Sequence, residues 1–257
     1  MKIEVYFLFC LFAFCFCGCQ SQNEKSSTAL NTVELKELYE KYQEVSYDRK
    51  EASEELFLFE KSVKKLFSEE KLSNIFLDSV IKSNDVFSEK SMDGKLLISS
   101  WEVIDFGCDH SYRSLLRYKD DQFFLVEYYA GVENDLFPKE KVRKTYPFKI
   151  HMLGKSKYLV ENTRLACQSE RIIEFDILTV KDGVIEDSNF SENKSELFYS
   201  ATRSDTIYPE FNKELKELSI PVRVPVFNEG QDTGFTKVTE ERQIYKYIDG
   251  AFVLQKP

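Results

Sequence analysis

The densest group of residues that could do chemistry is the tripeptide Cys108-Asp109-His110. In an extended chain Cys108 and His110 share a face, because side chains alternate between the two faces of a strand. Together with His151 or Cys167 they would supply the nitrogen and sulfur ligands of a zinc site. A thiolate held by the neighbouring imidazole would instead be a nucleophile. Structural roles are commoner for such residues, so we expect no catalytic residue, metal or cofactor, and keep Cys108 and His110 as weak metal candidates.

The surroundings of these residues favour structural roles. His151 alternates with Phe148, Ile150 and Met152. Because strand residues alternate between faces, we expect His151 on a solvated face beside Lys149. The tripeptide is expected in a loop that ends a preceding strand.

Carboxylates are the second kind of candidate, since two carboxyl groups that flank a cleft about 5–10 Å apart can hydrolyse glycosides. The acidic side chains considered are Asp105, Asp109, Asp120, Asp121, Glu127, Glu133 and Asp135. Turns and solvated strand faces explain them without a cleft, so we expect them to be structural.

The N-terminus carries the most informative segment. Residues 5–17 form an uncharged run of thirteen residues. A membrane-spanning helix needs about 20 apolar residues, whereas the hydrophobic region of a signal peptide has about 7–15. The run leads into Phe16-Cys17-Gly18-Cys19. This ending resembles the lipobox of bacterial lipoproteins, in which the last cysteine is acylated and the chain is cut before it. That family usually has Leu where this chain has Phe16 and a small residue where it has Cys17.

The resemblance implies a lipoprotein signal peptide over residues 1–18 and a lipid, such as palmitate, on Cys19. The alternatives are an uncleaved hydrophobic anchor and an ordinary secretory signal. Residues 19–31 would then be the lipidated cysteine and a flexible tether, because residues 20–31 are polar and mostly small. Cys108 and Cys167 would remain as a pair, which in an oxidising compartment predicts a disulfide; two buried thiols are the alternative.

Composition excludes some partners. The chain has 257 residues and a formal net charge of −9, which argues against nucleic acid and against anionic lipid head groups. It contains 22 Phe, 14 Tyr and one Trp. Aromatic residues pack well on pleated faces, so this enrichment predicts a β-rich core. The alternative is a surface on which sugars stack.

A helical pattern covers residues 32–85. Apolar residues recur there at helical spacing, in two stripes formed by Leu35, Leu38, Tyr39, Tyr42 and Val45, and by Leu56, Phe59, Val63, Leu66 and Phe67. Lys and Glu fill the opposite faces. The spacing therefore predicts a helical segment ahead of the main body.

A β pattern covers residues 92–257. Asp-Gly pairs at 93–94, 182–183 and 249–250 lie between apolar runs, which is the strongest short-range hairpin signal. Ile173, Phe175 and Ile177 alternate with Glu174 and Asp176, and the valines at 222, 224 and 226 share a face. The pattern predicts about ten strands joined mainly by hairpins. We therefore expect an α+β fold, with N-terminal helices followed by a mostly antiparallel β meander that forms a curled sheet or a barrel-like one.

A second resemblance covers roughly residues 85–130. Asp93-Gly94-Lys95 and the strand ending in Ser100-Trp101, with Gly107 and residues 111–119 in the later places, resemble a family of uncharacterised bacterial envelope lipoproteins. The resemblance implies a helical lead-in followed by a β meander, and it implies no activity.

These observations predict a membrane-anchored envelope lipoprotein that serves as a binding or structural module. The membrane contact would be the lipid on Cys19, in the outer membrane if the cell is Gram-negative, with the body in the periplasm or at the cell surface. The expected partner is an envelope protein or a glycan, and not nucleic acid. The alternative is an envelope hydrolase with a carboxylate site or a Cys/His site.

Overall fold

A computed structural model describes residues 37, 38, 40–42, 44, 54–68, 86–106, 109–129, 132–134, 137–165 and 170–255, the last range without 193, 195 and 203. The predicted signal peptide, the tether, Cys19, Cys108 and Cys167 lie outside these residues. No helix among the described residues has the length and apolar character needed to cross a membrane. The chain divides into two compact units, Met1–Leu66 with Lys71–Val80, and Phe67–Glu70 with Ile81–Pro257.

Helix α3 spans Glu54–Ser68. Leu56, Phe59 and Val63 are buried along one face of it, as their spacing predicts. The ring of Phe59 stacks on that of Tyr42, with 6.5 Å between the ring centroids.

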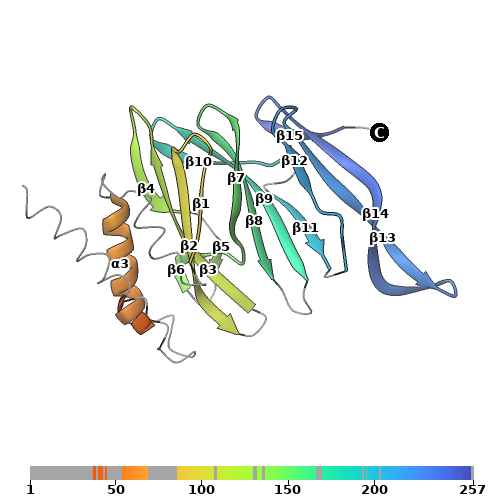
Figure 1. Cartoon of the computed structure of the whole chain (residues 1–257), viewed down its shortest axis with the longest axis horizontal. Coiled ribbons are helices and arrows are strands. Elements are labelled where there is room, and N and C mark those ends of the chain that lie inside the picture. The colour runs from red at the N-terminus through yellow and green to blue at the C-terminus, as the bar shows by residue number, and fades with distance from the viewer. Residues whose placement is uncertain are drawn as a thin grey trace, which may run out of the picture. The chain divides into compact units, whose positions relative to one another are not determined.

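The second unit consists of antiparallel sheets (Figure 1). The β1–β4 sheet has the order β1-β2-β3-β4, formed by β1 (Val86–Lys90), β2 (Leu96–Phe106), β3 (Asp109–Lys119) and β4 (Phe124–Tyr128). The residues in its turns explain the turn conformations. Gly94 has a φ of +72°, which a residue without Cβ adopts at little cost. Asp120 Oδ1 accepts hydrogen bonds from the backbone N–H groups of Gln122 and Phe123, at 2.9 and 2.8 Å.

The β7–β10 sheet has the order β10-β9-β8-β7, and β11 pairs with β9 beside β10. Its strands are β7 (Tyr146–Gly154), β8 (Lys157–Leu165), β9 (Arg171–Lys181), β10 (Val184–Ser188) and β11 (Leu197–Ala201). Two short strands, β5 (Val132–Asn134) and β6 (Phe137–Val142), pair with each other between the two sheets in the sequence.

The β12–β15 sheet ends the chain, in the order β12-β13-β14-β15. Its strands are β12 (Glu210–Asn212), β13 (Glu217–Asn228), β14 (Gln231–Ile248) and β15 (Ala251–Leu254). The predicted turn at Asp249-Gly250 joins β14 to β15, and the one at Asp182-Gly183 joins β9 to β10. All three Asp-Gly pairs therefore lie in hairpin turns, as predicted.

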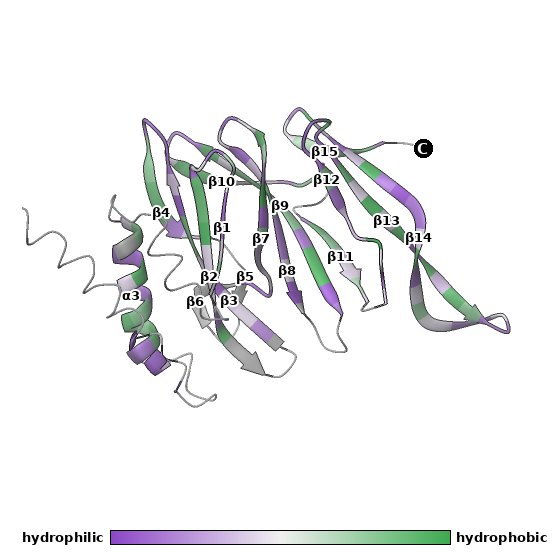
Figure 2. Ribbon diagram, in the orientation of Figure 1, coloured by the Kyte–Doolittle hydropathy of each residue, from purple (hydrophilic) through white to green (hydrophobic). Residues whose placement is uncertain are grey.

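The β7–β10 sheet contributes side chains to two hydrophobic clusters. Leu159, Ile173, Phe175 and Ile177 belong to a cluster with residues of the β12–β15 sheet. On the other face, residues of β8 and β9 join a cluster with residues of the β1–β4 sheet, formed by Leu96, Ile98, Leu116, Tyr118, Tyr129, Ile150, Tyr158, Val160, Leu178 and Val180. Hydrophobic and hydrophilic stretches alternate along the strands (Figure 2), as expected for sheets whose faces differ.

The structure corrects the predicted fold class. The described residues are mostly antiparallel β-sheet with few helices, so the chain is mostly β rather than α+β. Each sheet among the described residues has unpaired edge strands and does not close into a barrel. The strand pattern also begins earlier than predicted, at Val86, because the turn at Asp93-Gly94 needs a strand on both sides.

Candidate functional site

The main polar site begins on strand β9. Glu174 and Asp176 alternate with Ile173, Phe175 and Ile177, which are buried in the cluster shared with the β12–β15 sheet. The two acids therefore lie on the opposite face, which further along β9 packs against the β1–β4 sheet. This face of β9 therefore carries buried acidic residues next to buried apolar residues.

Arg143, just after β6, supplies a cation. Its backbone is held by a bridge to β3, in which Arg143 N–H donates to the Tyr112 carbonyl over 2.9 Å and Tyr112 N–H donates back over 2.7 Å. Arg143 Nη2 donates to Asp176 Oδ2 over 2.5 Å and also to Glu174 Oε1. The side chains of Arg143, Glu174 and Asp176 are only 11%, 8% and 15% exposed. This is a buried charge network, in which losing one partner leaves an uncompensated charge.

Neutral donors complete the network. Tyr129 Oη donates to Asp176 Oδ2 over 2.7 Å, and Asn162 Nδ2 donates to the same oxygen over 2.9 Å. Thr145 Oγ1 donates to Glu174 Oε2 over 2.5 Å. Tyr129 follows β4, Thr145 precedes β7 and Asn162 lies on β8. The network therefore connects three other segments of the chain to β9.

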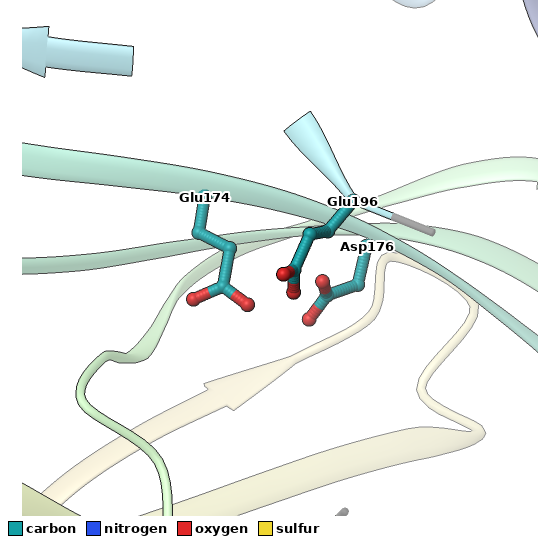
Figure 3. Close-up of side chains that lie close together, drawn as sticks. All are labelled: Glu174, Asp176 and Glu196. Carbon is teal, nitrogen blue, oxygen red and sulfur yellow. The ribbon is translucent and has the colours of Figure 1, made fainter. Parts of the chain in front are cut away.

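A third carboxyl group comes from Glu196, just before β11. One carboxylate oxygen from each of Glu174, Asp176 and Glu196 lies within 4.8 Å of the others. Figure 3 shows the three carboxyl groups directed into one region. We call Glu174, Asp176 and Glu196 the carboxyl cluster.

The electrostatics of the network favour a proton on Glu174. Burial raises the pKa of Glu174 to about 8, against the attraction of Arg143, and the charge of Asp176 and a hydrogen bond with Glu196 act in the same direction as burial. Burial and the neighbouring Asp176 also raise the pKa of Tyr129 well above its ordinary value. Burial alone would lower the pKa of Arg143, but the surrounding negative charges raise it. These shifts in pKa favour a guanidinium, a neutral phenol and a protonated carboxyl group in the network.

The predicted candidates lie elsewhere. His110 Nδ1 contacts Glu102 Oε1 across the β2–β3 pair. His151 Nε2 lies 3.4 Å from Glu161 Oε2. Each of the two histidines therefore lies beside a different glutamate, Glu102 or Glu161.

The face that carries His151 is less solvated than predicted. The His151 side chain is 22% exposed, and its ring lies 4.9 Å from that of Phe211 on β12. The sequence of β7 gave no sign that Phe211 of β12 lies against this face.

Three of the acidic residues considered as carboxylate candidates, Asp120, Asp121 and Glu127, have described side chains. Asp120 accepts the turn hydrogen bonds described above, and Asp121 and Glu127 are exposed. The residues of the carboxyl cluster were not predicted as a site, nor were Arg143, Tyr129, Thr145 and Asn162. One feature of the sequence could have indicated part of this site. Glu174 and Asp176 directly precede the run Ile177-Leu178-Thr179-Val180, which is buried in the structure. A strand buried on both faces cannot leave acids on a solvated one.

A second feature is the outer part of the β13–β14 hairpin, residues 222–241, which we call the ribbon. β12 pairs only with Glu217–Ser219 of β13, and β15 pairs only with Tyr245–Ile248 of β14. Among the described strands the ribbon is therefore two-stranded, and it extends from the sheet in Figure 1. An open depression lies near its base, lined by Glu210, Phe211, Asn212, Glu217, Ser219 and Ile244.

The ribbon carries exposed apolar side chains. Phe235 is 73% exposed and Phe227 is 61% exposed. The base is held by Arg223, whose Nη1 donates to the Ser200 carbonyl over 2.9 Å and also to Asp205, and whose Nε donates to Thr236 Oγ1 over 2.9 Å. The ribbon therefore leaves the sheet in a defined direction.

Comparisons of the chain with protein-family models, with the curated proteins and with the solved structures found no match.

Proposed function

We propose that this chain is an envelope lipoprotein, tethered by lipid on Cys19, that binds another envelope protein through its ribbon. The observation that carries the proposal is the exposure of Phe227 and Phe235 on a two-stranded extension. A two-stranded hairpin is at best marginally stable in water by itself. Large apolar side chains at the end of one are well placed to be buried by a partner.

The side chains of the ribbon favour a protein partner over a glycan. Phenylalanine has no polar tip, whereas the aromatic residues that combine an apolar body with a hydrogen-bonding group are Tyr and Trp. The valines at 222, 224 and 226 extend the apolar character along one strand. The negative net charge of −9 agrees with the absence of nucleic acid from the proposed partners.

The hydrolase alternative has one feature in its favour, the raised pKa of Glu174, because a general acid needs a proton at neutral pH. However, Glu174 is 8% exposed and accepts hydrogen bonds from Arg143 and Thr145. Glycosidase carboxyls flank a cleft that admits a sugar ring. The network is better suited to holding strands together than to reaching a substrate.

The test is site-specific photo-crosslinking in intact cells. A photoreactive residue replaces Phe235 in one variant and Val184, another exposed apolar residue (56% exposed, on β10), in the control. We expect a discrete protein adduct from position 235 and none from position 184. The same adducts from both positions, or none from position 235, would count against the proposal.

The lipid anchor needs its own measurement, the intact mass of the protein extracted from its native membrane. We expect a chain that starts at Cys19 and carries acyl mass, because an acylated cysteine is what the resemblance to the lipobox implies. The mass of an unprocessed chain without acyl groups would contradict the proposed attachment to the cell envelope, independently of what the ribbon binds.

A further inference from the structure

The ribbon carries an excess of negative charge around its exposed phenylalanine rings. Four of its residues are acidic and exposed to solvent, namely Glu229, Asp232, Glu240 and Glu241. Its two basic residues are Arg223 and Lys237, and Arg223 is ion-paired with Asp205, which lies outside the ribbon. With Arg223 neutralised in this way, the four acids exceed the remaining base, Lys237, by three charges.

The fold places these acids beside the rings. Phe227 of β13 is directly opposite Asp232 of β14 in the sheet register, and residues opposite each other in a ladder lie side by side on one face. Glu229 lies in the turn that joins the two strands, and the last two acids of the ribbon follow Phe235 on β14. Along the ribbon, apolar rings and carboxylates therefore form one surface.

A β-bulge fixes the backbone that carries Phe235. The register of the ribbon shifts at Val226, which lies opposite residues 233–235 of β14. Thr233 Oγ1 donates to the Val226 carbonyl over 2.6 Å, and Asp232 Oδ1 accepts a hydrogen bond from the backbone N–H two residues further on, over 2.9 Å. Bulges redirect the side chains next to them. A backbone that is already ordered loses less entropy when a partner binds.

We propose that the ribbon binds an apolar cleft of a partner protein whose rim carries lysine and arginine side chains. The inference rests on the proposed function and adds the chemistry of the partner. The exposed rings supply apolar area for a cleft to bury, and protein interfaces place complementary charges around such a centre. The negative excess on the ribbon therefore requires a positive excess on the surface that receives it.

The same charges argue against two other occupants. A bilayer that took up the rings would also have to take up Glu229 and Asp232, which lie at the same end of the ribbon, and charged side chains are costly inside a membrane. Anionic head groups would repel them as well. A second copy of this chain would bring four more acids to the interface, and like charges placed face to face suppress association. A basic protein surface is the occupant that fits both the rings and the charges.

The first experiment repeats the photo-crosslinking from position 235 in lysed cells, at NaCl concentrations from about 20 to about 500 mM. Salt screens exposed charges but does not weaken the burial of apolar surface. We therefore expect the yield of the protein adduct to fall about fivefold or more over this range. A yield that stays constant or rises would overturn the basic rim and leave a protein partner in place. Absence of a protein adduct at every salt concentration would instead remove the proposed function, and this inference with it.

Two double variants locate the charges that act. Glu240→Gln with Glu241→Gln removes two negative charges and keeps both the position of the crosslinker and the hydrogen bonds of the bulge, so we expect about fivefold less adduct at low salt. The matched control, Asp121→Asn with Glu127→Gln, removes the same charge from two exposed residues of the β3–β4 hairpin, and we expect no change. An unchanged yield in the ribbon variant, or equal losses in both variants, would overturn the proposal.

The identity of the adduct separates the possible occupants. An adduct at twice the mass of the chain would show that the ribbon binds a second copy, and an adduct with lipid would show that the rings enter the bilayer; either result would overturn the proposal. We expect a different protein, in which basic residues outnumber acidic ones around the crosslinked position. A crosslinked surface without this excess would contradict the basic rim. The salt series requires no change to the acidic residues, so it tests the proposal even where a charge variant fails to fold.

Discussion

Strands β9 and β14 both depart from the usual distribution of side chains. On β9 acidic side chains are buried, and on β14 a large apolar side chain is exposed. β9 (Arg171–Lys181) places Glu174 and Asp176 in the interior, where Arg143 and neutral donors surround them. β14 (Gln231–Ile248) places Phe235 in solvent on the ribbon. The interior acids have hydrogen-bond partners within the chain, whereas most of the Phe235 side chain is exposed to solvent. The difference indicates that the network stabilises this fold, whereas the ribbon is available for another molecule.

The largest effect is expected from removing the interior cation. Arg143→Met leaves Glu174 and Asp176 without their guanidinium, and breaking a buried pair in this way costs about 3–5 kcal/mol. Chemical denaturation measures the loss. Lys237→Met on the ribbon is the control, expected to stay within about 0.5 kcal/mol, because Lys237 is exposed. Equal losses in the two variants would remove the distinction between the two regions.

The pH dependence of stability should come next. The pKa of Glu174 is raised to about 8 in the folded chain from an ordinary value of 4.5, so the folded state holds a proton that the unfolded state has lost. The stabilisation is complete below about pH 4.5, and it declines as the pH rises through about 8, by at most about 1.4 kcal/mol per pH unit.

Denaturation at a series of pH values with and without Glu174→Gln isolates this contribution. The variant cannot ionise at this position, so its stability should decline less than that of the native chain between pH 5 and 9. Parallel curves for the two proteins would mean that Glu174 does not carry the proton.

A smaller loss should follow removal of one neutral donor. Tyr129→Phe deletes one of three donors to Asp176 Oδ2, and a hydrogen bond to a charged group contributes about 1.5–3 kcal/mol. Tyr247→Phe is a matched control, because the buried Tyr247 hydroxyl has no hydrogen-bond partner among the residues that the structure describes. Thermal or chemical denaturation should show the control to be neutral or slightly stabilised, and a larger loss in the control would contradict the assignment of the network.

The smallest effect on stability is expected on the ribbon. Phe235→Ser removes a ring that is 73% exposed, so the free energy of unfolding should change by no more than about 0.5 kcal/mol. Binding to the envelope partner, measured as crosslinked adduct from a photoreactive residue at position 227, should fall strongly. A marked loss of stability without any loss of adduct would make Phe235 a packing residue instead.

Local features of the fold could be predicted from the sequence. The Asp93-Gly94, Asp182-Gly183 and Asp249-Gly250 turns lie where expected, since each depends on the backbone freedom of two neighbouring residues. The alternation over 173–177 also holds, because it needs only an extended backbone. The predicted proportion of helix to strand was wrong. The described residues are mostly β, with fifteen strands where about ten were expected. Several of the additional strands, such as β5 and β12, have only three residues and too little pattern to detect.

The amino-acid sequence by itself therefore determined the turns, the faces of the strands and the expectation of a lipid address at Cys19. Only the tertiary structure decided that Arg143 meets Glu174 and Asp176, which lie 31 and 33 residues further along the chain. The physical reason is the range of the interactions. A turn or an alternating strand depends on neighbouring residues, whereas the partner of a buried charge depends on strand register and on which sheet covers which face. Those are set by packing across the whole second unit, so the carboxyl cluster became visible only once the strands were placed.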